Sequence, residues 1–301
     1  MAHGRPISRT VVISGGTDGM GRGIALARLG LGDTVVSLGS SEAKGAALTA
    51  EAVALGAADR FSFVKADLSS IAETQRVVEL IAHEHPAVDA LVLCANRQSP
   101  ARQETAEGLE FTFGLYYLSR YLLGHGLREQ FDAAEHPVII NFAAPGLKVG
   151  TVRFDDLQAE QRYSTLRAQA QAGRAIDLLG ASFGQEPSSK ARYVLFHPGF
   201  TATLGGIAHL NQPVKGIITV LSKIAAKPVD KAIAPILPLI DEPPTDTLTA
   251  IDRGKPVDLT LRTFDPDNAR RLAQVTRKLV VEHYGPTHLL PPEPSNSSSP
   301  A

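Results

Sequence analysis

Residues 14–21 read SGGTDGMG, from Ser14 to Gly21, and they indicate the class of fold. It follows a short apolar run and precedes a helical pattern that continues to about Leu29. Glycines at such a junction permit a tight turn and let the backbone approach a pyrophosphate, which then lies on the free N–H groups at a helix start. The order of strand, loop and helix predicts a dinucleotide-binding unit, although an ordinary strand-to-helix turn would also explain the glycines.

Short apolar runs rich in β-branched residues recur up to His197 and alternate with longer segments of helical periodicity. Parallel strands need crossover connections of this length, and helices on both faces of the sheet make such strands apolar throughout. The pattern therefore predicts a single-domain α/β fold with a doubly wound parallel sheet. The expected strands are Thr10 to Ser14, Thr34 to Leu38, Phe61 to Ala66, Ala90 to Ala95, Val138 to Ala143 and Arg192 to His197.

The chain after Gly199 predicts further elements and a polar tail. Asp265 and Pro266 have the residue types of an N-cap and a first helical position, and an apolar stripe follows them. Residues 286–301 are rich in proline and serine, so we expect a domain over residues 1–285 and a disordered tail over 286–301. The other expected elements are helices at Val214 to Ala226 and Val229 to Ile240, a strand at Thr247 to Ile251, and the stripe Ala269, Leu272, Val275 and Leu279.

Composition narrows the classes of partner. The chain has 301 residues, a formal net charge of -1 and interspersed charges, so no basic surface points to nucleic acid or to a membrane, and a small-molecule substrate is favoured. The only cysteine, Cys94, excludes an internal disulfide and a thiolate cluster, and no metal site is expected. The absence of a secretory signal or an apolar run of about 18 residues indicates a cytoplasmic protein.

The glycine loop and four later motifs resemble the short-chain dehydrogenase/reductase family, whose fold is Rossmann-like. Ser14 takes the place of threonine in the fingerprint T-G-x-x-x-G-[IM]-G. The resemblance implies cofactor contacts from the strand ends on one edge of the sheet. The residues that it assigns to the cofactor are Gly15, Thr17, Asp18, Gly19, Met20, Gly21, Ser40, Ser41, Asp67, Leu68, Ala95, Asn96, Pro198, Gly199 and Thr201.

The end of the second strand bears on the choice of nicotinamide cofactor. A carboxylate there would bind the ribose hydroxyls of NAD and repel the extra phosphate of NADP. The sequence instead has Ser40, Ser41 and, shortly after, Lys44, which favours NADP(H) over NAD. Ser41 and its neighbour would equally well cap the next helix, and the two roles are compatible.

The family's catalytic positions carry other residues here. In the family a tyrosine exchanges a proton with the substrate oxygen and a lysine four residues later lowers its pKa, while a serine and an asparagine assist. The segment Val138 to Leu179 resembles the retinol-dehydrogenase-like branch, and Phe113 to Leu118 resembles the branch's F-G-V-N-H-L. A gapless alignment then puts Tyr116 at the asparagine, Ala144 at the serine, Gln169 at the tyrosine and Gly173 at the lysine.

Gln169 and Tyr116 are the two candidates for assisting chemistry. A glutamine can orient a carbonyl but cannot exchange a proton near neutral pH, and the ordinary interpretation of Tyr116 is a core aromatic. Tyr163 and Arg167 have the tyrosine–lysine spacing, but a continuous helix would put Tyr163 about 9 Å along the axis from Gln169 and about 120° around it. We expect Arg167 and Arg174 to face solvent or a partner subunit.

Three functions remain open. The resemblance implies an NADP(H)-dependent oxidoreductase that acts on a small carbonyl or hydroxyl compound by non-standard chemistry. The replaced positions allow instead a non-redox enzyme that catalyses cyclisation, elimination or rearrangement by holding a reactive conformer. The third alternative is a non-catalytic cofactor-binding protein. Analogy with the family also suggests a homodimer or tetramer that pairs through the helices holding Tyr116 and Gln169.

Overall fold

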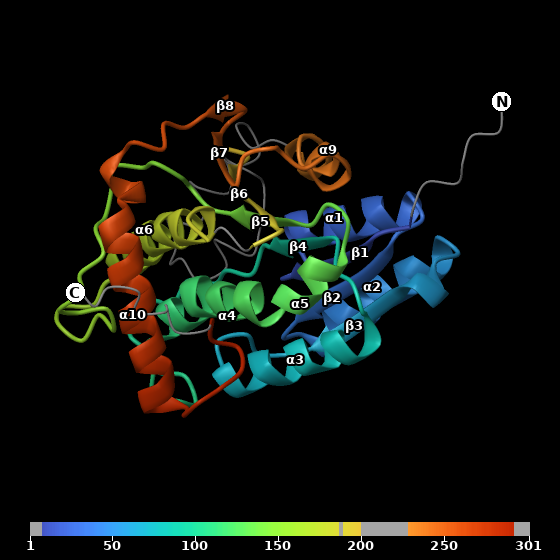
Figure 1. Cartoon of the computed structure of the whole chain (residues 1–301). Helices are drawn as coiled ribbons and strands as arrows, with labels where there is room; N and C mark the ends of the chain where they lie inside the picture. The colour runs from blue at the N-terminus through green and yellow to red at the C-terminus, as the bar shows by residue number, and fades with distance from the viewer. Residues whose placement is uncertain (1–7, 187–188, 200–227, 292–301) are drawn as a thin grey trace, which may run out of the picture.

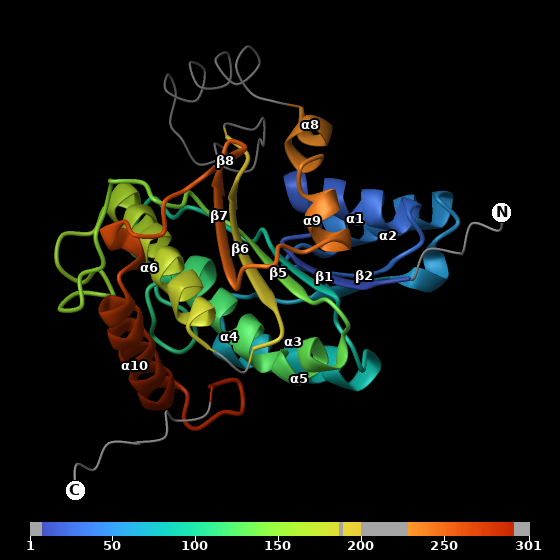
Figure 2. The same ribbon diagram turned by 45° about the horizontal axis from the view of Figure 1, so that its top comes forward.

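The apolar runs of the sequence form the strands of one sheet. The computed structural model describes residues 8–186, 189–199 and 228–291, and its sheet has the order β3-β2-β1-β4-β5-β6-β7-β8 (Figures 1 and 2). All neighbouring strands are parallel except the last pair. The bounds are β1 Thr10–Ser14, β2 Thr34–Gly39, β3 Phe61–Lys65, β4 Ala90–Leu93, β5 Val138–Phe142, β6 Arg192–His197, β7 Leu248–Asp252 and β8 Lys255–Pro256. The predicted doubly wound α/β fold is confirmed.

Strand β1 lies where the chain reverses its direction across the sheet. Val12 is in register with Val36 of β2 on one side and with Leu91 of β4 on the other. Connections on the two sides therefore leave β1 in opposite directions, which opens a crevice beyond the carboxyl ends of the strands. This edge of the sheet positions the candidate site.

Helices cover both faces of the sheet and bury two apolar clusters against it. On one face, Ile24 of α1, Leu48 of α2 and Ile236 share a cluster with β1, β4 and β5. On the other face, Val77 of α3 and Leu122 of α4 belong to the second cluster. The helices of the first face are α1 Gly19–Gly30, α2 Glu42–Ala54, α8 Val229–Ile233 and α9 Leu237–Asp241, and those of the second are α3 Ile71–Glu84, α4 Ser119–Gly126, α5 Arg128–Ala133, α6 Thr165–Gly184 and α10 Pro266–His283.

Short irregular helices join these layers. The segment η2 Phe113–Leu118 is a π-helix that continues directly into α4, and η1 Ala58–Arg60 and η4 Arg262–Phe264 are 3-10 turns. A π-helical turn inserts one residue into the helical ladder and is frequent at functional sites. None of the helices in the described ranges combines the length and the apolar character that crossing a bilayer requires.

Proline divides the helix expected at Val229 to Ile240 into α8 and α9. Pro235 lies between them. It interrupts the helix because proline has no N–H and its ring clashes with the preceding helical turn. Pro238 is accommodated near the start of α9, because the N–H that proline lacks would have no helical partner at that position. The helix expected at 214–226 lies outside the described residues.

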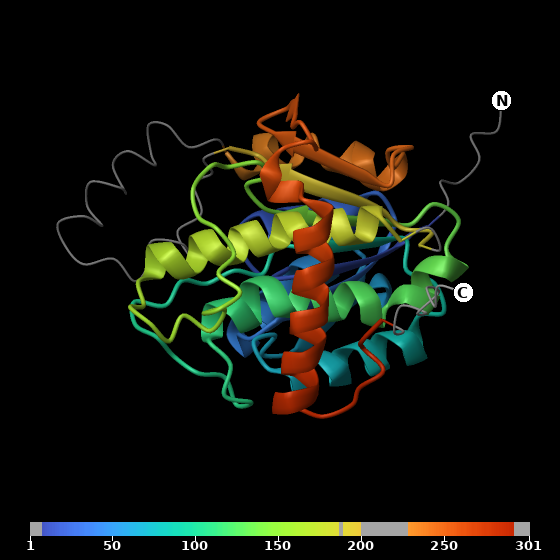
Figure 3. The ribbon, with the colours of Figure 1, turned by 60° about the vertical axis from the view of Figure 1, so that its left-hand side comes forward.

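Helix α10 follows the predicted cap and crosses α6 and α4 (Figure 3). The Asp265 side chain accepts a hydrogen bond from Asn268 N at 2.8 Å, as an N-cap should. The hydroxyls of Thr276 and Tyr117 are 2.8 Å apart and connect α10 with η2. Helix α10 thus occupies part of the face through which the expected pairing of subunits would run.

Part of the segment expected to be a disordered tail lies against the domain. Leu289 is fully buried, and the Thr287 hydroxyl donates to Gln75 Oε1 at 2.8 Å. Arg277 donates a hydrogen bond to the carbonyl oxygen of Pro291. The ordered domain thus extends from the expected boundary at residue 285 to residue 291, and residues 292–301 lie outside the described ranges. The sequence concealed this because prolines flank the pair of leucines.

Candidate functional site

The glycine loop connects β1 with α1 at the crevice. Gly15 has φ +69°, and a Cβ atom there would lie 2.8 Å from Ala95 Cα, so only glycine fits. A Cβ atom on Gly21 would lie 2.3 Å from the carbonyl oxygen of Gly15. These close approaches keep the loop flat against the start of α1, where backbone N–H groups are available to an anion.

Charged groups flank the start of α1. Asp18 is the N-cap of the helix and accepts from Gly19 N at 2.7 Å. Lys44, at the start of α2, forms an ion pair with Asp18, and its hydrogen bond holds the pKa of the Asp18 carboxyl below its usual range. Ser41 is the N-cap of α2, so its capping role is confirmed, while the neighbouring Ser40 is exposed.

Asp67 presents a carboxylate to the same cavity from the end of β3. Its Oδ1 accepts from Ser69 N at 3.0 Å and from the Ser69 hydroxyl at 2.7 Å. Its Oδ2 has no hydrogen-bond partner within the described residues, so it can accept from a ligand. The turn that ties Oδ1 therefore orients a carboxylate whose second oxygen remains available.

One cavity of about 650 Å³ collects the candidate cofactor residues. It follows the carboxyl ends of the central strands, from the glycine loop to the turn after β6. Thr201 lies outside the described residues. The candidates that line the cavity are Gly15, Thr17, Asp18, Gly19, Met20, Gly21, Ser40, Ser41, Asp67, Leu68, Ala95, Asn96, Pro198 and Gly199.

The two candidates for catalysis lie in different surroundings. Tyr116 of η2 lines the cavity together with Ala144. Gln169 of α6 does not line it: its side-chain amide pairs with that of Asn96 through two hydrogen bonds of 3.3 Å. Gly173 is buried, yet a Cβ atom added to it would meet no atom within 4 Å, so this part of α6 borders an unfilled space.

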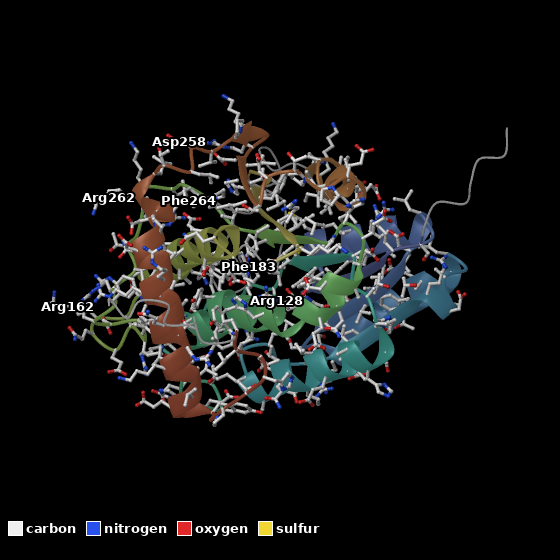
Figure 4. The ribbon with its side chains drawn as sticks, in the orientation of Figure 1. Arg128, Arg162, Phe183, Asp258, Arg262 and Phe264 are labelled. Carbon is white, nitrogen blue, oxygen red and sulfur yellow. The ribbon has the colours of Figure 1, made fainter. Side chains whose placement is uncertain are left out.

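Tyr163 stands before α6 and not on it. Ser164 is the N-cap of that helix, and the Tyr163 hydroxyl donates to the carbonyl oxygen of Ser99 at 3.0 Å. Arg167 donates to the carbonyl oxygen of Arg162 at 2.7 Å. Figure 4 shows Arg162 at the outer edge of the molecule. Tyr163 and Arg167 are thus held by contacts away from the cavity and do not form an acid–cation pair in it.

Arg120 is a cavity residue that sequence reasoning missed. It lies on α4 four residues after Tyr116, is 1% exposed, and lines the cavity. Its guanidinium donates to the carbonyl oxygens of Phe142 at 2.7 Å and Ala95 at 2.9 Å, and to the Asn141 side chain. The available signal was a single basic residue in a stretch that is apolar all round, which is typical of a buried helix.

His197 and Cys94 also line the cavity and carry groups that could take part in chemistry. His197 Nδ1 lies 2.6 Å from Asp252 Oδ1, and its Nε2 has no hydrogen-bond partner within the described residues. Such a carboxylate fixes the orientation of an imidazole and leaves the other nitrogen for proton exchange. Burial raises the pKa of the Cys94 thiol to about 12, so it is not a thiolate near neutral pH.

Arg174 is buried, contrary to the expectation that it faces solvent or a partner. Its Nη2 donates to the carbonyl oxygen of Ala144 at 2.7 Å and its Nη1 to that of Leu147 at 2.6 Å. Nη1 is also 2.7 Å from Asp177 Oδ2. Arg174 therefore fixes the loop after β5, and the buried ion pair explains how a charge is tolerated there.

A second cavity, of about 490 Å³, adjoins the Arg174 network. It lies between the loop after β5, helix α6 and the segment that leads into α10, and Phe154 and Leu178 are among its apolar residues. Arg262 is at its rim, and Figure 4 shows that side chain pointing outward from the domain. Burial raises the pKa of Asp177 to about 6.

The sheet order, the glycine loop and the cavity at the strand ends define a Rossmann-like α/β protein. Residues 9–146 match the family model described as short chain dehydrogenase. Human retinol dehydrogenase 14 is 24% identical over 298 residues, which cover 93% of this chain and 87% of the relative.

Another relative and a solved structure are also similar to this chain. Human polyprenol dehydrogenase is 27% identical over 176 residues, covering 56% of this chain, and the match spans only 53% of that relative. RhlG of Pseudomonas aeruginosa, solved in an active-site complex with NADP, has a TM-score of 0.61 at 18% identity, covering 84% of this chain and 99% of RhlG. At that identity, the likeness to RhlG concerns the fold.

Proposed function

We propose that the protein binds NADP(H) in the 650 Å³ cavity and acts as an oxidoreductase on a small organic carbonyl or hydroxyl compound. The observation that carries the proposal is the convergence of every candidate cofactor residue in the described ranges on this one cavity. The match of residues 9–146 to the short chain dehydrogenase family model supports it.

The residues present fit a dinucleotide. The N–H groups at the start of α1 and the close backbone approach at Gly15 would hold the pyrophosphate. The free Oδ2 of Asp67 would accept a hydrogen bond from the adenine amine. Exposed Ser40 and the Lys44 ammonium would receive the 2′-phosphate, with Asp18 partly neutralising that cation. The cofactor would supply or accept the hydride.

We further propose that the chemistry departs from the family's usual proton relay. Ala144, Gln169 and Gly173 carry no group that exchanges protons near neutral pH. A proton would then come from water or from another side chain in the cavity, and Tyr116 and His197 are the side chains that we propose for it. The protein would hold the substrate oxygen against one of them.

An apolar substrate suits this cavity. Phe111, Leu115 and Phe142 line it near Tyr116, so the part of the substrate beside its oxygen would contact aromatic and aliphatic groups. Retinol and polyprenol, named in two relatives, are apolar alcohols of this kind. We therefore propose an apolar alcohol, aldehyde or ketone as the substrate class.

A non-redox enzyme is the second candidate. The absence of an acid–cation pair at Gln169 and Gly173 favours it. The protein would bind the cofactor without consuming it, and it would promote cyclisation, elimination or rearrangement by orienting the substrate. A non-catalytic cofactor-binding protein would use the cavity without turnover.

Cofactor binding and cofactor consumption together test these functions. NADPH is titrated against the protein by fluorescence, and NADPH absorbance is then followed with aliphatic and aromatic aldehydes and ketones, including all-trans-retinal. We expect saturable NADPH binding and consumption of NADPH equal to the alcohol formed. Product without NADPH consumption would establish the non-redox reading instead. Failure to bind either NADPH or NADH would contradict all nicotinamide-dependent functions.

A further inference from the structure

Within the carbonyl chemistry proposed above, on which this inference rests, we propose that Tyr116 and Arg120 form an acid–cation pair on the helix η2–α4. Tyr116 donates the proton to the substrate oxygen, and Arg120 stabilises the negative charge that the phenol then carries. Both side chains line the cavity, and Arg120 Cζ lies 4.5 Å from the centre of the Tyr116 ring.

The Tyr116 hydroxyl is available to a ligand. It makes no hydrogen bond to any described residue, and its side chain is only partly buried. The adjacent Tyr117 is 1% exposed and its hydroxyl is occupied by Thr276. Tyr116 therefore faces the cavity and Tyr117 the core, because successive side chains of a helix point in different directions.

Arg120 supplies a positive charge that no carboxylate neutralises. Within the described ranges it forms no ion pair, and its guanidinium is held by the neutral oxygens of Ala95, Asn141 and Phe142. Asn141 is itself oriented, since its amide donates to the Tyr193 hydroxyl at 2.7 Å. A guanidinium stays charged in proteins, so its field acts on any charge that develops beside it in this buried place.

The spacing of the pair equals that of the family's tyrosine and lysine, but on the neighbouring helix. Residues four apart lie on the same side of a helix, and the π-helical turn at η2 retains this relation between Tyr116 and Arg120. The open space at Gly173 leaves the corresponding part of α6 without a side chain. Acid and cation would both come from η2–α4.

The proton balance follows from the surrounding charges. Burial raises the pKa of Tyr116, Arg120 of α4 and Arg174 of α6 oppose that change, and Asp177 of α6 adds to it. The phenol is therefore protonated near neutral pH and can donate. As a new O–H bond forms on the substrate, the Tyr116 O–H bond breaks, and the phenolate recovers a proton from water entering the open cavity. The bound reduced nicotinamide would supply the hydride for the new C–H bond.

Neighbouring tyrosines allow a matched test of the donor. Tyr116→Phe should lower kcat for carbonyl reduction by about 100-fold or more, the usual contribution of a positioned acid, and leave NADPH affinity and unfolding unchanged. Tyr117→Phe should do the reverse, lowering stability through loss of the Thr276 contact while retaining kcat. Full kcat in a folded, NADPH-binding Tyr116→Phe protein would overturn the proposal.

The role of Arg120 has a readout that does not need turnover. Trifluorotyrosine, whose phenol titrates well below that of tyrosine, is placed at position 116 and followed by ¹⁹F NMR against pH. Arg120→Met should raise the titration midpoint by about 1 to 3 pH units, and Arg120→Lys should restore most of the shift. An unchanged midpoint in Arg120→Met would refute the pair. If the labelled phenol responds but no carbonyl is reduced, the electrostatic pair stands and the proposed oxidoreductase function fails.

Discussion

Asn96 and Gln169 form a reciprocal amide pair, with Nδ2 to Oε1 and Nε2 to Oδ1 both 3.3 Å. This contact joins the end of β4 to α6 beside the cavity. It occupies one donor and the acceptor of Gln169, the residue expected from its alignment to orient a substrate carbonyl. The position thus has a structural partner within the protein.

Gln169→Ala is therefore expected to have a small effect on turnover. Losing an exposed pair of neutral hydrogen bonds should cost about 1 kcal/mol or less, so kcat should fall by no more than about 5-fold. Steady-state kinetics beside Tyr116→Phe provides the comparison. A larger loss in Gln169→Ala than in Tyr116→Phe would transfer the main catalytic role to Gln169.

Combining Gln169→Tyr with Gly173→Lys should create or increase carbonyl reductase activity. The space at Gly173 can accept a lysine stem, and the new pair would have the family's spacing on α6. We expect a rate increase of about 10-fold or more from the added acid. The single Gln169→Tyr variant is the control, because its phenol lacks the cation. An unchanged rate in a folded double variant would mean that the cavity does not present substrate to α6.

Gly173→Ala should stabilise the protein. Alanine is favoured over glycine inside a helix by about 1 kcal/mol, and the added methyl group meets no neighbour within 4 Å. Urea unfolding should show a higher midpoint with the same slope. Gly180→Ala on the same helix is the matched control, since its Cβ would lie 2.9 Å from Leu195 Cδ1 and should remove the gain. Equal effects of the two substitutions would contradict this account.

Ser40→Asp should shift cofactor preference from NADPH towards NADH. A carboxylate at the end of β2 would repel the 2′-phosphate and accept hydrogen bonds from the ribose hydroxyls. The ratio of the two dissociation constants should change by about 10-fold or more, equivalent to about 1.4 kcal/mol. Fluorescence titrations with both nucleotides measure it, and Ser40→Asn controls for size. An equal change in both affinities would show that Ser40 does not face the ribose.

His125 should make the fold sensitive to acid. It packs between Tyr121 and Phe183, each ring centre 4.5 Å away, and burial lowers its pKa to about 3. An unfolded histidine takes up a proton near pH 6.5, so its contribution is complete above that pH and is lost as pH falls from 6.5 towards 3. Relative to His125→Phe, wild-type unfolding free energy should fall by up to about 1.4 kcal/mol per pH unit in that window. Parallel pH profiles of the two proteins would contradict the assignment.

The fold was predictable because its signals are local. Apolar β-branched runs specified the strands, and the glycine loop specified the start of α1, where the positive φ of Gly15 makes glycine necessary. Asp265 and Pro266 marked the beginning of α10 in the same way. Each of these patterns depends on neighbouring residues only.

The electrostatics of the site were not predictable, because burial of a charge is decided by distant parts of the chain. Arginine is ordinarily exposed, yet Arg120 is buried by the ends of β4 and β5, and Arg174 by the loop after β5. The candidate cofactor residues at the strand ends were easier, because parallel strands bring their carboxyl ends to one edge. Which candidate side chains face the cavity depended on the turns of η2 and α6.

The position of α10 has a consequence for dilute solutions. An apolar helix face that is covered by another subunit becomes exposed when the subunits separate. Helix α10 belongs to the same chain as the helices it covers, so its local concentration beside them does not change on dilution. The packing that α10 gives to the η2–α4 segment therefore does not depend on the concentration of the protein.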